Sequence, residues 1–450
     1  MSRCSWWLTG VLTCGTAAHA NDLRQLYEIA LTRDPTLQAA RSQRAAAVEV
    51  KPQALSQLLP QVAATASGMR ERADYAAFNV GGTQAVDCTL SPDNSTEHCH
   101  ASAHSLGLQL SQTVWSYEAF SQVKEASFQA AAAESGWRGE QQNLLLRVSR
   151  AYFTILSATD QLAANRSERD AFGTLLTQAK TREQTGVGPR SDVEQAQSFF
   201  DATEENVIDA QNALDDADLA MTQIVGSFDE KIAPLREEIP LTTPDPASAD
   251  EWVAAALRDN FDVRVAQLSA QAAEREVSVQ RGKGLPTLTL TGSTSRLWQD
   301  AVLGGNQALD AVALSFQWPL FQGGAVASAV RQAGAQYRQA QSQYEVSQRL
   351  CERNVRAAYR GIVTGLARIA AARRAVASGQ KAVEASRRNV EFGTGNEFDL
   401  LNAQNNYYSS VRAYDQARYD YLTSVLTLKQ QAGRLTEHDL AAIDDLLVER

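Results

Sequence analysis

Residues 185–192 read TGVGPRSD and residues 392–399 read FGTGNEFD, so a Gly-x-Gly turn recurs at an offset of 207 (393 − 186). Ala196-Gln197 and Ala403-Gln404 keep the same offset. Upstream, LPQV at residues 59–62 returns as LPTL at 285–288, at an offset of 226 (286 − 60). Two copies of one structural unit are therefore fused, and the change of offset places an insertion in the first copy.

The N-terminus is predicted to be a secretory signal peptide, residues 1–20. Arg3 precedes an apolar stretch over 6–18, and Ala18-His19-Ala20 supplies small residues at positions −3 and −1 of a cleavage site. An alternative is a lipoprotein acylated at Cys14, but Thr13 stands where a small residue is expected. The rest of the chain has no run of 18 apolar residues, so we expect no helical membrane span. A formal net charge of −10 argues against nucleic acid as a partner.

Each copy is predicted to begin with a helix and continue into two strands. Residues 22–59 show helical spacing of apolar side chains, and Pro60 must end that helix. Beyond it the polarity alternates: Leu106, Leu108 and Leu110 lie on one face of a strand, with polar residues between them. The same alternation predicts strands at about 61–75, 104–115, 286–298 and 310–321.

A very long helical hairpin is predicted after each pair of strands. The first helices cover about 116–185 and 323–392, and after each Gly-x-Gly turn a second helix follows, at about 192–225 and 397–432. Helices of this length belong to long bundles or coiled coils. The predicted organisation is a first repeat at 21–226, a linker at 227–249, a second repeat at 250–433 and a C-terminal segment at 434–450.

Four amphipathic strands leave two unpaired edges and one apolar face. Strands of about ten residues match the thickness of an outer membrane, but known closed barrels start at about eight strands. A chain that contributes four strands must therefore assemble with other copies. The alternative left by the pattern is a soluble helical rod with a β cap.

The chain resembles the TolC family of outer-membrane channel proteins over nearly its whole mature length. The resemblance rests on the duplicated order of elements and on the strand-to-helix stretch WPLFQGG at 318–324. It implies an all-α body plus membrane β structure: a homotrimer with a 12-stranded outer-membrane β-barrel, and a long α-helical barrel that extends into the periplasm. The implied partners are outer-membrane lipid, a periplasmic adaptor (membrane fusion) protein and an inner-membrane pump, driven by ATP (ABC type) or by protons.

The resemblance implies transport without catalysis or cofactor: an exit duct for proteins (type I secretion) or for small toxic compounds (efflux). The poor lipidation signal favours the type I or general-purpose branch. The alternative function is a periplasmic helical-hairpin structural or adaptor protein without a pore.

The expected functional residues cluster at the Gly-x-Gly turns. By resemblance, the turns are adaptor contacts: Gly186, Val187, Gly188, Gly393, Thr394 and Gly395. The pore constriction is assigned to residues that follow the turns: Asp192, Gln195, Asp399 and Asn402. A structural explanation also exists, in which the glycines close helix ends, Asn396 caps one helix and Ser191-x-x-Glu194 forms a capping box on the other.

The family's gate-locking Tyr and Arg correspond here to Val390 and Gly395, so locking by those side chains is not expected. Positions where the two copies disagree, such as Arg190 against Glu397 and Gln195 against Asn402, are where we expect the gate.

Cys88 and Cys99 are predicted to form a disulfide in the inserted loop of an exported protein. A zinc or copper site is the alternative, because His98, His100 and His104 lie in the same loop. Cys351 is expected to be a small buried apolar residue. The aromatic residues near strand ends fit an interfacial girdle or ordinary packing: Trp115, Tyr117 and Trp298.

Overall fold

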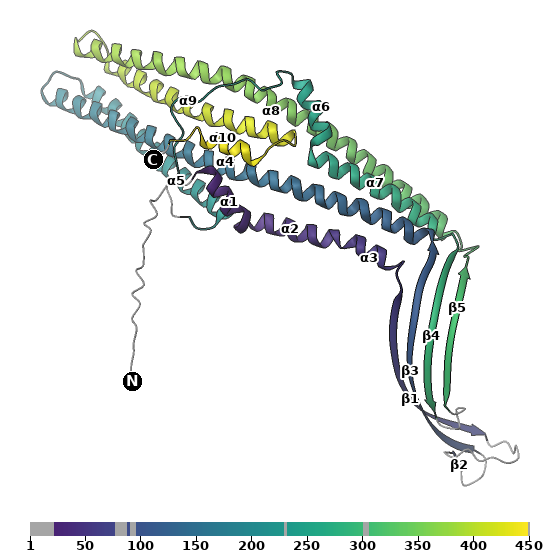
Figure 1. Cartoon of the computed structure of the whole chain (residues 1–450). Helices are drawn as coiled ribbons and strands as arrows, with labels where there is room; N and C mark the ends of the chain where they lie inside the picture. Colours follow the sequence, from purple (N-terminus) through teal and green to yellow (C-terminus); the bar gives the residue numbers. More distant parts are fainter. Residues whose placement is uncertain (1–21, 77–87, 91–95, 229–231, 300–305, 449–450) are drawn as a thin grey trace, which may run out of the picture. The chain divides into compact units, whose positions relative to one another are not determined.

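A computed structural model describes residues 22–76, 88–90, 96–228, 232–299 and 306–448 (Figure 1). The predicted signal peptide lies outside these residues. The chain divides into two compact units. Unit 1 consists of residues 1–42, 136–264 and 347–450, and unit 2 consists of residues 43–135 and 265–346.

The same order of elements occurs twice along the chain. The helices are α1 (Leu23–Arg33), α2 (Pro35–Val48), α3 (Val50–Ser56), α4 (Tyr117–Gln184), α5 (Arg190–Val225), α6 (Ala249–Asp259), α7 (Phe261–Gly282), α8 (Ala325–Glu391), α9 (Glu397–Gln431) and α10 (Glu437–Asp444). The strands are β1 (Gln61–Ala76), β2 (Cys88–Leu90), β3 (Thr96–Ser116), β4 (Thr287–Gln299) and β5 (Gln307–Gln317). No helix among the described residues is both long and apolar enough to cross a membrane.

The sheet of unit 2 joins the two copies side by side. Its strand order is β1-β3-β4-β5, all pairs are antiparallel, and the short β2 pairs with β3. β1 and β5 are therefore its outer strands in the described part of the chain. One face, which we call the apolar face, carries largely apolar side chains that are exposed or half-buried: Val62, Leu106, Leu108, Leu110, Leu288, Leu290, Val312, Leu314 and Phe316. The other face carries mostly small and polar side chains: Thr65, Ser67, Gln109, Ser111, Thr291, Ser293 and Ser315.

The strand bounds differ from the predicted ones at two places. β3 begins at Thr96 rather than near 104, because its pairing with β1 continues through the inserted segment. β5 covers 307–317 rather than 310–321. Pro319 lacks the N–H that a ladder needs, and this explains why the strand stops before it.

The single helix predicted over 22–59 is wrong, because the structure divides this segment into α1, α2 and α3. The first break is at Asp34, whose side-chain Oδ2 accepts a hydrogen bond from the backbone N–H of Leu37 at 2.8 Å. Asn260 does the same in the second copy, where its Oδ1 accepts from Val263 at 3.0 Å. The two residues are related by the offset of 226 (260 − 34), so the helix breaks belong to the repeat. A side chain that offers the backbone an acceptor favours a helix start over helix continuation.

Within unit 1, buried polar contacts hold α4 against α9. Glu168 on α4 is buried and forms an ion pair with Arg412 on α9, which also donates to Asn165 Oδ1 at 3.0 Å. The hydroxyl of Tyr419 donates to Asp160 at 2.6 Å. A buried charge is tolerated only when it is paired in this way, so these contacts fix the register of one helical hairpin on the other.

The linker and the C-terminal segment also meet within unit 1. A bridge pairs Leu235 with Leu447, and Arg236 donates its backbone N–H to Leu446 at 2.9 Å. Tyr421 on α9 donates its hydroxyl to the carbonyl of Thr242 at 2.8 Å. The segments that follow each repeat thus close onto the bundle.

In unit 2, Glu125 on α4 faces Glu276 on α7. Burial, together with the hydrogen bond and charge of Glu276, raises the pKa of Glu125 to about 7. A carboxyl whose pKa is raised on folding stabilises the fold below its unfolded pKa, and that stability is lost as the pH rises through the folded value. We expect the melting temperature of the parent protein to fall between pH 5 and pH 8. Most of this decrease should be absent in the Glu125→Gln variant.

The expected difference in melting temperature between the variant and the parent at pH 8 is about 2 °C or more, with little difference at pH 5. Exposed Glu205 on α5 offers a matched control, Glu205→Gln. Parallel pH profiles for Glu125→Gln and the parent protein would contradict the assignment.

Candidate functional site

The tips of the two helical hairpins are closed by the same hydrogen bonds. After α4, the N–H of Gly186 donates to Glu183 O and that of Val187 to Arg182 O, both at 2.9 Å. After α8, Gly393 donates to Val390 O at 3.2 Å and Thr394 to Asn389 O at 2.9 Å. This pair of bonds is the Schellman motif, which satisfies the last carbonyls of a helix. The sequence repeat is therefore reproduced bond by bond.

The two glycines of each turn are needed for different reasons. Gly186 and Gly393 have φ of 75° and 68°, the left-handed region that favours glycine. Gly188 and Gly395 are needed for space: a Cβ at Gly395 would lie 2.7 Å from Asn389 Cβ, and one at Gly188 would lie 3.0 Å from Arg182 Cβ. The helical tip folds back so closely on the preceding helix that it leaves no room for a side chain.

This difference predicts that Gly395→Ala loosens its tip more than Gly393→Asn does. Asparagine visits the left-handed region at modest cost, whereas the alanine Cβ must displace the α8 backbone. We expect about 1–3 kcal/mol of local destabilisation for Gly395→Ala. Amide hydrogen exchange over residues 385–402 measures it, with Gly188→Ala as the matched change in the other tip. If the amides of Gly395→Ala and of the parent are equally protected from exchange, a Cβ at position 395 does not crowd the tip.

The helices that follow the tips begin at equivalent positions. Asn396 caps α9, its Oδ1 accepting from the N–H of Phe398 at 3.1 Å, which confirms the predicted cap. The predicted capping box at Ser191 and Glu194 is wrong: α5 begins at Arg190, and its N-cap is Pro189. Because the helix starts two residues earlier than that box requires, Ser191 lies inside the first turn and Glu194 pairs with Arg190 instead, at 3.3 Å.

The four residues assigned to the constriction all lie in the first two turns of α5 and α9. Asp192 and Asp399 both occupy the third helical position, where a carboxylate interacts favourably with the helix dipole. Asp399 and Gln195 are exposed, whereas Asp192 and Asn402 are half-buried. Asn402 donates its side-chain N–H to the carbonyl of Phe398 at 3.0 Å. Within a single chain, Asp399 is thus the aspartate with the freer access to solvent.

An ion pair at these tips was not anticipated from the sequence. Arg182 at the end of α4 lies 3.3 Å from Glu397 at the start of α9, and Glu397 is 5% exposed. Burial raises the pKa of Glu397, Arg182 opposes that rise, and the nearby charge of Asp192 adds to it. The contact joins the two hairpins of one chain. The sequence offers one sign of it, because the two copies of the repeat disagree at Arg190 and Glu397. That disagreement marks the position of Glu397 but does not identify Arg182 as its partner.

A compact apolar cluster lies beneath the tips. It consists of Phe172, Leu175, Leu176, Ala179, Ala196, Val383, Leu400, Leu401 and Ala403. The ring of Phe172 stacks on Phe199 at 5.4 Å, and Phe199 meets the edge of Phe398 at 6.4 Å. Val390, at one position of the family's gate lock, packs against this cluster. All four helices of the hairpins are therefore packed together close to the candidate constriction.

Residues expected to act elsewhere lie on the sheet. The backbones of Cys88 and Cys99 face each other directly in the pairing of β2 with β3. Their side chains, and those of His98 and His100, lie outside the described ones, so both the disulfide and the alternative metal site stay predictions. Cys351 is buried, as expected, and burial raises the pKa of its thiol to about 11.

Trp115 pairs with Leu288 across a bulge in β3, and Trp298 pairs with His104 near the other end of β4. Both indoles are close to half exposed. The two tryptophans therefore lie near opposite ends of the paired strands, as a girdle requires. Tyr117, the first residue of α4, is also exposed.

The family model described as outer membrane efflux protein matches residues 26–227 and 252–434. The chain belongs to this family. The two matched stretches coincide with the two structural repeats, and the resemblance seen in the sequence is confirmed. The family is one of outer-membrane efflux proteins, not of enzymes, and its place is the outer membrane.

Relatives of the efflux family cover nearly the whole chain. The chain is 29% identical to the outer membrane protein TolC of Vibrio cholerae, over 96% of this chain and 95% of that protein. It is 30% identical to the alkaline protease secretion protein AprF of Pseudomonas aeruginosa, over 98% of this chain and 91% of that one. In structure it is similar to the outer membrane protein VceC of Vibrio cholerae, with a TM-score of 0.77 at 18% identity, covering 91% and 96% of the two chains. The predicted fold class, a mostly helical chain with a β portion, is confirmed.

Proposed function

We propose that three copies of this chain form an exit duct through the outer membrane, which receives cargo from an inner-membrane pump. The observation that carries the proposal is the sheet of unit 2. It has one exposed apolar face, one polar face and two outer strands, β1 and β5, that end the described pairing. Lipid covers an apolar face, while a polar face suits a water-filled lumen.

The need to close the sheet into a barrel is the reason for proposing three copies. Four long strands are too few for a barrel, and three chains supply 12 by pairing β5 of one copy with β1 of the next. Such a closed ring leaves no sheet edge, which is the condition for a sheet in lipid. Each chain then contributes two hairpins to a helical tube that continues the lumen into the periplasm.

The hairpin tips are the proposed docking surface for a periplasmic adaptor protein. The two tips are alike in backbone geometry and expose their central residues; Val187 is 79% exposed. Three chains would thus present six similar tips to adaptor subunits. Residues of the first helical turns, with Asp399 foremost, would then surround the periplasmic entrance as an acidic ring that favours cations.

The cargo proposed here is protein. Two of the relatives are named for protease secretion, the alkaline protease secretion protein AprF and the proteases secretion protein PrtF of Dickeya chrysanthemi. Another is named an outer membrane efflux protein, BepC of Brucella suis, so small compounds are the competing cargo. Deleting the gene and scoring both secreted proteins and sensitivity to toxic compounds separates the two.

The duct is tested by gel electrophoresis of outer-membrane fractions with and without boiling, and by planar-bilayer conductance. We expect a heat-sensitive trimer and stable single-channel currents. Recovery as a soluble monomer would instead support the pore-free hairpin protein, an alternative that does not fit a chain whose two repeats both match the efflux family.

A further inference from the structure

The apolar face of the sheet contains a charged patch that the duct itself does not need. Side chains directly opposite one another form rows across the strands. Row A holds Val62, Leu110, Gly292 and Val312; row B holds Ala64, Leu108, Thr294 and Asp310; row C holds Ala66, Leu106, Arg296 and Ala308. Row A is nearest the helical ends of the strands, and row C is farthest from those ends. In these three rows, the charged side chains are Arg296 and Asp310.

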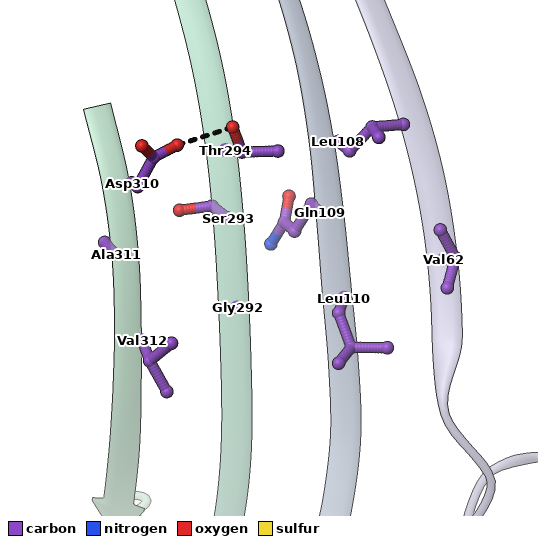
Figure 2. Close-up of a pocket in the computed structure, with 10 residues that line it drawn as sticks. All are labelled: Val62, Leu108, Gln109, Leu110, Gly292, Ser293, Thr294, Asp310, Ala311 and Val312. Carbon is purple, nitrogen blue, oxygen red and sulfur yellow. Dashed lines mark hydrogen bonds between the residues drawn. The ribbon is translucent and has the colours of Figure 1, made fainter. Parts of the chain in front are cut away.

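The two charges form a cross-strand ion pair. Arg296 Nη1 lies 3.0 Å from Asp310 Oδ1. The same oxygen accepts the hydroxyl hydrogen of Thr294 at 2.6 Å, a bond that Figure 2 shows. Both side chains remain exposed, at 46% and 68%. A guanidinium has five N–H donors in a planar fork. Nη1 also donates to the carbonyl of Ser295 at 3.0 Å, and Nη2 lies 3.5 Å from Asp310 Oδ2. The remaining donors, Nε foremost, can engage a second anion beside Asp310.

Small side chains leave two hollows next to this pair. One, of about 410 Å³, lies around Gly292, between Val62, Leu110 and Val312 (Figure 2). Most of its lining belongs to rows A and B, and the residues between those rows complete it: Gln109, Ser293 and Ala311. The other, also about 410 Å³, lies over Ala64 and Ala66 and reaches Arg296. Leu108 and Thr294 line both hollows, so they adjoin. Their walls are mainly apolar and suit an alkyl chain.

The position of the pair on the strand indicates the polar boundary of the membrane. A charge on the lipid-facing side of a barrel costs most at the midplane and little near the interface. Trp298, one step beyond Arg296 on the same face, is exposed and lies opposite His104. Tryptophan concentrates at membrane interfaces. Arg70 lies further along the same face of β1 and is exposed, so a second arginine lies on this face toward the ends of the strands that are away from the helices.

We infer that this patch binds one outer-leaflet lipid per chain, with a headgroup phosphate on Arg296 and an acyl chain in the hollows. The assignment to the outer leaflet rests on the proposed function, in which the helical ends of the strands face the periplasm. The chemistry required is a phosphate and an alkyl chain on one molecule. A free phosphate satisfies Arg296 but leaves the hollows unfilled.

Native mass spectrometry of the purified protein in mild detergent tests the inference, with diphosphoryl lipid A as the probe. We expect one bound lipid per chain, and at least five-fold weaker binding for Arg296→Gln. Asp310→Asn removes the anion that competes for Arg296, so it should bind the lipid as well as the parent or better. Equal losses in the two variants, or no loss in Arg296→Gln, would overturn the inference.

A second variant addresses the acyl chain. A Cβ at Gly292 would approach Leu110 no closer than 3.8 Å, and β-branched residues favour strands, so Gly292→Val should fold well while it fills the hollow. We expect it to weaken lipid binding at least three-fold. Unchanged binding in Gly292→Val, or displacement of the lipid by millimolar inorganic phosphate, would contradict an acyl site.

The folding control is the heat-sensitive oligomer and its bilayer conductance, measured for every variant. Arg296→Gln is expected to retain both while it loses the lipid. The two proposals can thus fail separately. Absence of conductance in the parent protein would count against the duct. Intact conductance together with unaltered lipid binding in Arg296→Gln would count against the lipid site alone.

Discussion

Replacement of Leu110 by arginine is expected to remove the protein from the outer membrane, whereas arginine at the adjacent Gln109 is expected to leave it there. Leu110 lies in the centre of the apolar face, directly opposite Gly292, and Gln109 lies on the polar face of the same strand. An arginine on the lipid side of a barrel costs about 2–4 kcal/mol at the midplane, equivalent to a factor of at least about 30 in the inserted fraction.

The comparison is sharp because both variants introduce the same residue at neighbouring positions of β3. The introduced side chain and the added charge are the same in both variants, so the two differ chiefly in the face of the sheet that carries the arginine. The measurement is the amount of heat-sensitive oligomer in outer-membrane fractions. Equal yields for Leu110→Arg and Gln109→Arg would show that the apolar face does not meet lipid, and would remove the main support for the duct.

Replacement of Asp399 by asparagine is expected to lower the preference of the channel for cations, with a fall of at least two-fold in the permeability ratio of potassium to chloride. Asparagine keeps the size of the side chain and removes its charge. In the proposed trimer the change removes three negative charges from one level of the entrance, where they act together on passing ions. The reversal potential in a planar bilayer under a potassium chloride gradient measures the effect.

Asp192→Asn is the matched variant, because Asp192 holds the same place in α5 but is half-buried. We expect it to have the smaller effect on selectivity. A reversal potential unchanged in Asp399→Asn would reject the acidic ring, and a larger change in Asp192→Asn would assign the constriction to the first hairpin instead. Glu397→Gln is unsuitable for this comparison, because that carboxylate is buried and paired with Arg182.

The repeat and the order of elements could be predicted from the sequence because they depend on local signals. Alternation at Leu106, Leu108 and Leu110 reports a half-buried strand, and Gly-x-Gly reports a helix end, whatever packs around them. The break at Asp34 was missed because apolar spacing continues through it. Only the paired behaviour of Asp34 and Asn260 reveals that the break recurs in both copies.

The residues of the candidate site were located by resemblance and by the repeat, but their contacts could not be predicted. Arg182 and Glu397 are 215 residues apart, and nothing local indicates that they meet. The same holds for Arg412 and Glu168, 244 residues apart. The Ser191 capping box failed for a different reason: the two competing helix starts lie only two residues apart. Pro189 has no backbone N–H to donate, so it suits the position just before the first helical residue, and the helix starts at Arg190.

The pairing of β3 with β4 ends at Ala103 and Gln299, but its pairing with β1 continues to Thr96 and Ala76. Seven residues of β3 thus run on in a narrower ribbon, over about 24 Å of strand. In the proposed duct, with the helices in the periplasm, this ribbon would be the first part of the protein to meet antibodies, phages or proteases in the medium. A short epitope tag placed at its end should therefore label intact cells, and would make the protein countable on the cell surface without opening them.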